Sequence, residues 1–496
     1  MFDGTCTEGC AVRMDIAVSV RGIEMNEGWT GTVEQAEARI SVGAAGWTQA
    51  AGTFHGGPHS ILVTGTLDLR GGEFWSCSST LTLGQPACGT TPVLRLAPGA
   101  AFHHGQGTVI NDGGRPDGES CHAEGTFELG RNLELWNLVP VGRDAAFGWH
   151  SALRVEGPGA LRVLNDLDQT KGELRGEISL AGRLLVRAEA EPSPECILTF
   201  DGAGLVQRVA FETGGGTCHL VVDNGAGSVS TEASTSDSAA PSLTLRSGTF
   251  VAPSGTLSLG TSVAPPAVAT PLRVAVGATF SHNRGTLRIV GSRISGDSFH
   301  GNSALDVPDR LEVNHFIVEE AVPAFGWHSS TQVLPPSTLV VLGDLTDHSE
   351  ALSGRFEVHG GFVLGALASG GTASLTFVGS GAATYQSEGG LHPQGDIRIV
   401  KPSGSLQLLA DWHLPGELQT FTVESGLLDS RRPPPRGGRD ARARGRGDAP
   451  AQRGELLARR AAALLEPGRD RAALNRSPRP SALPAAGRCS GRAQED

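Results

Sequence analysis

Phe147-Gly148-Trp149-His150 recurs further along the chain as Phe325-Gly326-Trp327-His328, an offset of 178 in the numbering. The same repeat offset relates many other positions of the two halves. A single offset held over that many positions indicates an internal duplication, which sets the frame for predicting the fold. Matching pairs include Leu94 and Leu272, Gly99 and Gly277, Phe102 and Phe280, His104 and His282, Leu133 and Leu311, Asp166 and Asp344, Leu174 and Leu352.

The duplication predicts where the repeat units begin and end. Val18 and Val20 align with Leu198 and Phe200, which lie late in the next unit, so the chain opens inside a unit. We therefore expect an N-terminally incomplete fragment. The predicted division is the end of a preceding unit in 1–44, a first unit in 45–222, a second in 223–400, the start of a third in 401–430, and a tail in 431–496.

Within a unit the hydrophobic period is 2, as in Leu67-Asp68-Leu69 and Leu257-Ser258-Leu259, and glycines separate the short runs. This pattern predicts strands of three to five residues joined by turns. Equivalent strands recur at intervals of roughly 22 to 30 residues, about the length of one coil of a parallel β-solenoid. With rungs roughly 4.8 Å apart, about 15 to 19 rungs are expected. We predict an all-β, elongated parallel β-helix. The competing fold is a tandem of two β-sandwiches, for which this spacing is short.

The tail differs from the body in composition and charge. Residues 431–496 contain 16 Arg and 7 acidic residues, whereas residues 1–430 contain 24 basic and 45 acidic residues. Alternation stops at Arg431-Arg432-Pro433, and proline cannot donate to a strand ladder. We predict a disordered Arg/Pro/Ala-rich tail, of the kind that a frameshift in GC-rich DNA would produce. A genuine basic tail that docks on the acidic body is the alternative.

The charge, the apolar runs and the absence of certain motifs argue against several classes of protein. An acidic body argues against nucleic-acid binding. No apolar run reaches the roughly 18 residues that span a bilayer, and no signal peptide is visible at the start of the chain. No phosphate-binding loop, zinc spacing or nucleophile elbow occurs, so neither a cofactor nor a metal is expected. The acidic stretch 111–119 lacks the spacing of a calcium loop, although a calcium site there is a minor alternative.

The cysteines predict disulfides. The spacing of Cys196 and Cys218 equals that of the strand residues Leu198 and Leu220, so one rung would bring the two cysteines to disulfide distance. The further candidates are Cys77 with Cys88, and Cys6 with Cys10. If a disulfide joins Cys196 and Cys218, their Cα atoms must lie within about 7 Å. Plain buried thiols are the alternative.

The repeated tetrapeptide allows two interpretations. In the structural one, its Phe and Trp fill the core at a corner and its His is solvated. In the functional one, the aromatic and imidazole rings are presented on one longitudinal face to stack on a sugar. The candidate ligand-binding residues are Phe147, Trp149, His150, Phe325, Trp327 and His328.

Paired carboxylates raise the question of a glycoside-hydrolase site. Asp166 and Asp168, like Asp344 and Asp347, are close enough in sequence to suggest such a pair. Because Asp166 and Asp344 recur in the same turn of both units, we favour structural turn aspartates. Glu134 and Glu312 recur in the same way and receive the same interpretation.

Stretches such as Gly255-Thr256-Leu257-Ser258-Leu259-Gly260 and Asp396-Ile397-Arg398-Ile399-Val400 resemble secreted bacterial β-solenoid exoproteins. These include autotransporter passengers and filamentous-haemagglutinin-like adhesins. The resemblance covers about residues 16–430 and implies a β-helix displayed outside the cell for adhesion or as a stalk. A partner would then be a surface glycan or a cell-surface protein. The missing signal peptide departs from this pattern.

From these observations we predict a non-catalytic extracellular or cell-surface scaffold or adhesin fragment. The alternatives are a polysaccharide-active β-helix enzyme, either a lyase or a hydrolase, and a carbohydrate-binding rod that uses the repeated tetrapeptide. If the tail is foreign to the fold, the last rung is uncapped and end-to-end self-association is expected. A charged cluster on one rung face, present in only one unit, would favour the enzyme.

Overall fold

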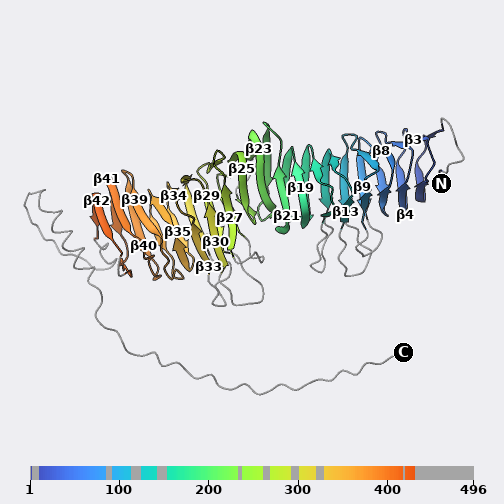
Figure 1. Ribbon diagram of the computed structural model, residues 1–496. Coiled ribbons are helices and arrows are strands. Elements are labelled where there is room, and N and C mark those ends of the chain that lie inside the picture. Colours follow the sequence, from blue (N-terminus) through green and yellow to red (C-terminus); the bar gives the residue numbers. More distant parts are fainter. Residues whose placement is uncertain are drawn as a thin grey trace, which may run out of the picture. The chain divides into compact units, whose positions relative to one another are not determined.

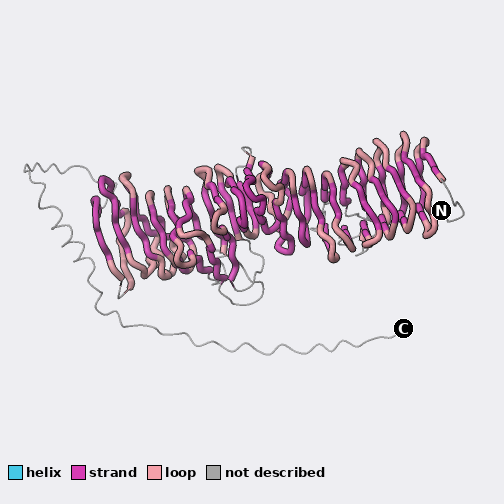
Figure 2. The backbone as a smooth tube through the Cα atoms, turned by 45° about the horizontal axis from the view of Figure 1, so that its top comes forward, coloured by secondary structure: helices cyan, strands magenta, loops and turns pink. Residues whose placement is uncertain are grey.

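The protein is described by a computed structural model that covers residues 2, 10–84, 92–112, 125–141, 153–232, 237–260, 268–291, 301–319, 329–416 and 419–430. The chain divides into two units, Met1–Gly438 and Arg439–Asp496, of which only the first contains described residues. Figure 2 shows this unit built from strands and turns, and the described residues contain no helix.

The described strands form three sheets, in which each strand pairs with one in the next coil of the chain. The first sheet contains β1 (Ala11–Met14), β3 (Thr32–Gln35), β5 (Thr53–His55), β8 (Gly72–Trp75) and β11 (Ala100–His103). The second contains β2 (Val18–Met25), β4 (Ile40–Gln49), β6 (Ile61–Val63), β7 (Leu67–Leu69), β9 (Thr80–Gly84), β10 (Leu94–Leu96), β12 (Thr108–Asp112), β13 (Gly125–Leu129), β14 (Leu133–Leu135), β15 (Asn137–Val141), β16 (Leu153–Glu156), β17 (Leu161–Val163), β18 (Asp166–Gly172), β19 (Leu174–Leu180), β20 (Arg183–Ala190), β21 (Ser193–Phe200), β22 (Val206–Phe211), β23 (Cys218–Thr231), β25 (Leu243–Val251), β27 (Val268–Val274), β28 (Thr279–Ser281), β30 (Gly301–Asp306), β33 (Ser329–Val333) and β36 (Ala351–Ser353).

The third sheet continues the stack toward residue 430 (Figure 1). It contains β24 (Asp237–Ala240), β26 (Thr256–Leu259), β29 (Thr286–Val290), β31 (Arg310–Val313), β32 (His315–Glu319), β34 (Thr338–Val341), β35 (Leu345–His348), β37 (Arg355–Val358), β38 (Phe362–Leu364), β39 (Ser374–Val378), β40 (Ala382–Ser387), β41 (Ile397–Leu408) and β42 (Phe421–Asp429).

The pairing is that of a parallel β-helix. In the first sheet Val33 pairs with Phe54 and Phe54 with Phe74, always in parallel. The same parallel pairing joins Ile40 to Ile61 in the second sheet and Phe356 to Leu375 in the third. The predicted β-solenoid is therefore confirmed, and a tandem of antiparallel sandwiches is excluded for the described strands.

One continuous apolar core runs through the rungs. Leu94, Leu96, Leu272 and Val274 are all buried, as the alternation predicts. Because side chains alternate across a strand, their neighbours Arg95 and Arg273 point outward and pair with Glu128 and Asp306 of the next rung. Rung after rung thus contributes an apolar stripe to the inside and a polar stripe to the outside.

Buried glutamines close several corners of the coil. The Gln207 side-chain nitrogen donates to the carbonyl oxygens of Leu180 (2.7 Å) and Gly182 (3.4 Å), and its oxygen accepts from the Gly202 amide at 3.2 Å. Gln35 and Gln49 likewise donate to carbonyls of their own turn and of the next rung. These contacts satisfy backbone groups that leave the ladder at a corner.

The repeat offset does not return the chain to the same face of the coil. Leu94 belongs to the row in which it pairs with Leu67 on one side and Phe127 on the other. Its counterpart Leu272 belongs to a different row. That row can be followed back through consecutive register pairs to Leu133, which lies one face after Phe127 along the chain. Its members are Leu133, Leu161, Ile178, Leu198, Leu220, Leu243 and Leu272. Positions related by the repeat offset therefore share strand register but occupy different faces.

Candidate functional site

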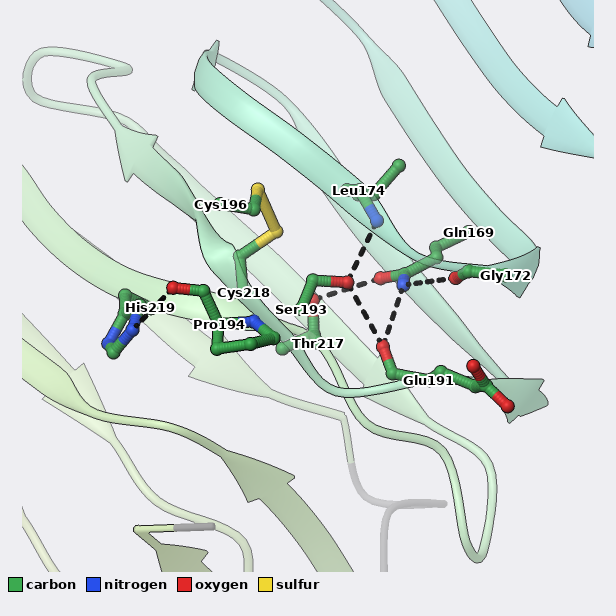
Figure 3. Close-up of a disulfide and its surroundings, with 10 residues drawn as sticks. All are labelled: Gln169, Gly172, Leu174, Glu191, Ser193, Pro194, Cys196, Thr217, Cys218 and His219. Atoms are coloured by element: carbon green, nitrogen blue, oxygen red, sulfur yellow. Dashed lines mark hydrogen bonds between the residues drawn. A yellow bond between two sulfur atoms is a disulfide. The ribbon is translucent and has the colours of Figure 1, made fainter. Parts of the chain in front are cut away.

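A disulfide joins two neighbouring rungs at the predicted place (Figure 3). Cys196 of β21 and Cys218 of β23 are linked, with Cα atoms 4.9 Å apart, inside the limit of about 7 Å set for this pair. Both residues are fully buried. The bond ties one turn of the coil covalently to the next.

Buried polar side chains pack beside this disulfide (Figure 3). The Thr217 hydroxyl donates to Gln169 Oε1 at 3.0 Å, and Gln169 Nε2 donates to the carbonyls of Gly172 and Glu191. The Ser193 hydroxyl oxygen accepts from the Leu174 amide at 2.8 Å. The corner is thus held by one covalent link and a set of paired backbone groups.

The other cysteines behave differently. Cys77 is a free, fully buried thiol, so the predicted Cys77–Cys88 disulfide is wrong. Its side chain packs into the apolar core, and burial raises the pKa of its thiol. Cys10 is disulfide-bonded, whereas Cys6 and Cys88 lie outside the described residues.

A row of rings, of which His55 and Trp75 are exposed and His103 is half-buried, lies on the outer face of the first sheet. His55 and Trp75 follow the buried Phe54 and Phe74, and His103 follows the partly buried Phe102. The three rings lie on successive rungs and are in register. The Trp75 and His103 ring centroids are 3.8 Å apart at 15°, and those of His55 and Trp75 are 5.8 Å apart at 28°. His104 stacks on Trp136 of the next rung at 5.7 Å. We call these five ring residues, His55, Trp75, His103, His104 and Trp136, the His/Trp strip.

The strip has polar neighbours on the same face. Glu34 precedes His55 in the ring row, and Thr32, Thr53 and Glu73 form the row beside it. The Trp75 indole nitrogen donates to Glu73 Oε2 at 3.3 Å. Trp75 is 38% exposed, so part of its indole ring is accessible at the surface.

Most rings of the strip are absent from the matching positions of the second unit. The register row of the second unit that corresponds to His55, Trp75 and His103 holds Ser230, Val251 and Ser281. The residue that the repeat offset matches to Trp136 is Asn314, which donates to the Arg284 carbonyl. The position that matches His104 does hold a ring, His282, and each of these two imidazoles accepts a hydrogen bond from the backbone amide two residues on. The repeated pattern thus accounts for His104 but not for the other four rings.

Sequence reasoning missed the strip, although a signal is present. Phe54-His55, Phe74-Trp75 and Phe102-His103 repeat one dipeptide pattern, an inward Phe followed by an outward ring, at the spacing of one rung. The equivalent dipeptides Phe250-Val251 and Phe280-Ser281 lack the second ring. A comparison of outward positions along the coil would have found it.

Ion pairs and hydrogen bonds engage three of the candidate carboxylates, those of Asp168, Asp344 and Asp347. Asp168 accepts two hydrogen bonds from the Arg187 guanidinium, at 2.7 and 2.8 Å, and that guanidinium also reaches Glu212 at 2.9 Å. Asp344 Oδ1 accepts from the Gly361 amide at 2.6 Å, and the buried Asp347 accepts from Ser349. These contacts fit the structural interpretation for Asp168, Asp344 and Asp347.

Asp166 and the recurring glutamates have different surroundings. Desolvation by burial raises the pKa of the Asp166 carboxyl, against the influence of nearby Arg183. Glu134 lies 3.6 Å from Arg162 on the next rung, which is a surface ion pair. Glu312 is exposed on β31.

The repeated tetrapeptide cannot be placed. Phe147, Trp149, His150, Phe325, Trp327 and His328 lie outside the described residues, as do 113–119 of the acidic stretch and the tail 431–496. The strands that precede the two tetrapeptides, β15 and β32, belong to different sheets. Among the side chains that the structure describes, no group of three or more His, Cys, Asp or Glu is arranged to hold a metal ion.

The described part of the chain contains no helix of the length and apolar character needed to cross a bilayer. No family model matches the sequence, and neither a curated protein nor a solved structure shows significant similarity to it.

Proposed function

We propose that the protein is a non-catalytic extracellular or cell-surface β-solenoid scaffold that acts as an adhesin through the His/Trp strip. The observation that carries this proposal is the exposed Trp75 between two stacked imidazoles, on a face whose counterpart in the second unit holds Ser230, Val251 and Ser281. Rigid, partly exposed aromatic side chains are typical anchors of binding surfaces.

The cysteines support a location outside the reducing cytosol. A structural disulfide between buried cysteines of adjacent rungs persists in oxidising compartments and is rare in the cytosol. The resemblance to secreted bacterial β-solenoid exoproteins points the same way.

Adhesion by Trp75 is the first testable prediction. Fluorescent beads coated with the oxidised full-length protein should adhere to immobilised mucin, matrix polysaccharide or cultured cells. Trp75→Ala should lower the adherent fraction about tenfold on at least one of these surfaces, because it removes the central ring of the strip. Val251→Ala, at the equivalent position of the second unit, is the matched control and should leave adhesion unchanged.

Circular dichroism should show that both variants keep the β-solenoid. If wild-type beads adhere to none of these surfaces, or if Trp75→Ala beads adhere as well as wild-type beads, the adhesin proposal is wrong.

The alternative function, a polysaccharide-active enzyme, has one observation in its favour, the raised pKa of the Asp166 carboxyl. A general acid needs such a pKa, but it also needs a second carboxylate across the substrate, and the nearby Asp168 is bound to Arg187. A reducing-sugar assay that detects cleavage by the wild type and none by Asp166→Asn would favour the enzyme over the scaffold.

A further inference from the structure

We propose that the His/Trp strip binds an extended, uncharged polysaccharide whose chain runs parallel to the stack of rungs. This inference rests on the proposed adhesin function and names the chemical class of its ligand.

The strip is a linear array with the period of the fold. His55, Trp75 and His103 occupy one register row, so their spacing along the row is that of neighbouring parallel strands, roughly 4.8 Å. A pyranose unit in an extended chain advances by a similar length. An extended polysaccharide can therefore place successive sugars against successive rungs, as a folded peptide or a compact ligand cannot.

The rings are already ordered. Trp75 stacks on His103 at 3.8 Å, and His104 stacks on Trp136 further along. Because mutual stacking and the rigid sheet fix the rings, little side-chain entropy is lost when a ligand binds. This preorganisation favours a ligand that makes many weak contacts along a line.

The orientation of the rings argues against a cationic ligand. Recognition of an ammonium or quaternary ammonium group needs an open aromatic face within about 6 Å. Here imidazole rings stack against the Trp75 indole from the two neighbouring rungs, so the ring row presents mainly ring edges to solvent. These edges form an apolar ridge along which the C–H groups of a sugar chain can pack by van der Waals contact.

The neighbours of the strip complete a surface for hydroxyl groups. Glu34 and Glu73 supply carboxylate oxygens that accept hydrogen bonds, and Thr32 and Thr53 supply hydroxyls. Charge-assisted hydrogen bonds from sugar hydroxyls to carboxylates are stronger than neutral ones. Arg13 pairs in register with Glu34 and offsets its charge. Glu73, next to Trp75 at the centre of the strip, repels uronic acids and sulfated sugars, so an uncharged chain is favoured over an anionic one.

The test is affinity electrophoresis of the oxidised full-length protein in gels that contain a β-glucan, a xylan, a mannan or an anionic polymer such as polygalacturonate. We expect retardation by at least one uncharged polymer and none by the anionic one. Trp75→Ala should weaken binding about tenfold or more. The double variant His55→Ala/His103→Ala should weaken binding more than Trp75→Ala does. Val251→Ala and Ser281→Ala, at the equivalent row of the second unit, should bind as the wild type does.

A gain-of-function variant keeps the test informative if ring removal disturbs folding. The triple variant Ser230→His/Val251→Trp/Ser281→His builds the same ring row on the second unit. In the Trp75→Ala background it should restore retardation in the gel that slows the wild type. Oligosaccharides that span more rungs should also bind more tightly until the strip is covered.

The outcomes separate the two proposals. If adhesion depends on Trp75 but only an anionic polymer or a peptide binds, the ligand class is wrong and the adhesin proposal stands. If uncharged polymers bind equally well to wild type and Trp75→Ala, the strip is not their site. If wild-type beads adhere to nothing, the adhesin proposal fails, whatever the gels show.

Discussion

His392 is a nearly fully buried imidazole near the last described rungs. Its ring lies 5.6 to 5.9 Å from those of Phe362, Tyr385 and Trp412, and its Nδ1 is 2.8 Å from the Pro393 carbonyl. Burial lowers the pKa of His392 to about 4. The native protein therefore holds this imidazole neutral well below the pH at which the unfolded chain takes up a proton.

This predicts a loss of stability in mild acid. Between pH 6.5 and about 4 the unfolded state binds one more proton than the native state at His392, so the free energy of unfolding falls as pH falls through this range. The full loss is about 3 kcal/mol, at 1.36 kcal/mol per pKa unit. Urea unfolding at pH 7 and pH 4.5 should show it, and His392→Phe should remove most of the difference.

His413→Phe is the control, because His413 is exposed, and this variant should keep the wild-type pH dependence. An unchanged slope in His392→Phe would mean that other groups cause the acid sensitivity.

Single residues also show how far the sequence predicts the structure. The inward Leu94 and Leu272 follow from alternation alone. The buried Gln207 and Lys401 do not, because a polar residue in a strand pattern is expected outside. The Lys401 ammonium donates to the carbonyls of Val378 at 2.7 Å and His359 at 3.3 Å. Such roles depend on where the coil turns a corner, which the strand pattern does not locate.

At the scale of the element, the Cys196–Cys218 disulfide links neighbouring rungs at a sequence separation of 22. Closing a loop of this length should stabilise the native state by about 3 kcal/mol in the chain-entropy model. Cys196→Ser/Cys218→Ser should lower the free energy of unfolding in urea by this amount. Because both sulfurs are buried, a reductant should cleave the wild-type bond slowly unless denaturant is present.

Cys77→Ser is the matched control, since Cys77 is buried but unbonded. Because it keeps the Cys196–Cys218 disulfide, it should respond to reductant as the wild type does, and peptide mapping should recover this link in both proteins. A double variant as stable as the wild type would mean that the corner is held by its hydrogen bonds.

Some features of the elements could be predicted from the sequence, and others could not. The spacing of Cys196 and Cys218 matched one rung and identified the correct pair. Cys77 and Cys88 are closer in sequence than one rung, and Cys77 is unbonded. The ring row of His55, Trp75 and His103 was missed because each ring belongs to a short strand that carries no signal when taken alone.

At the scale of the whole described unit, the register is the same at positions related by the repeat offset. Leu94 pairs with Phe127, and Leu272 pairs with Leu305. Leu67 pairs with Leu94, and Leu243 pairs with Leu272. Sequence comparison predicted the matching strands, but it could not predict that their faces differ, because turn lengths vary from rung to rung.

This register predicts that a shortened chain will fold. Deletion of residues 94–271 joins Val93 to Leu272 and lets Leu67 pair with Leu272, as Leu243 does in the full chain. Each rung contacts mainly its neighbours, so the remaining rungs should stack without strain. Circular dichroism and cooperative urea unfolding should show a folded β protein.

Deletion of residues 94–281 is the control, because it also removes the rest of β27 and all of β28, and so breaks the order of the faces. It should give a less stable or aggregated product. If the two shortened chains are equally stable, the matching register at Leu94 and Leu272 is not what allows a shortened chain to fold.

The change of face between Leu94 and Leu272 has a consequence for evolution by duplication. A coil that copied itself in whole turns would line up every duplicated feature along one side. Here Leu272 lies on a different face from Leu94, so positions related by the repeat offset face different sides of the coil. Copying such a segment would give each copy its own outward face, where the residue at a matching position can differ, as Trp75 and Val251 do.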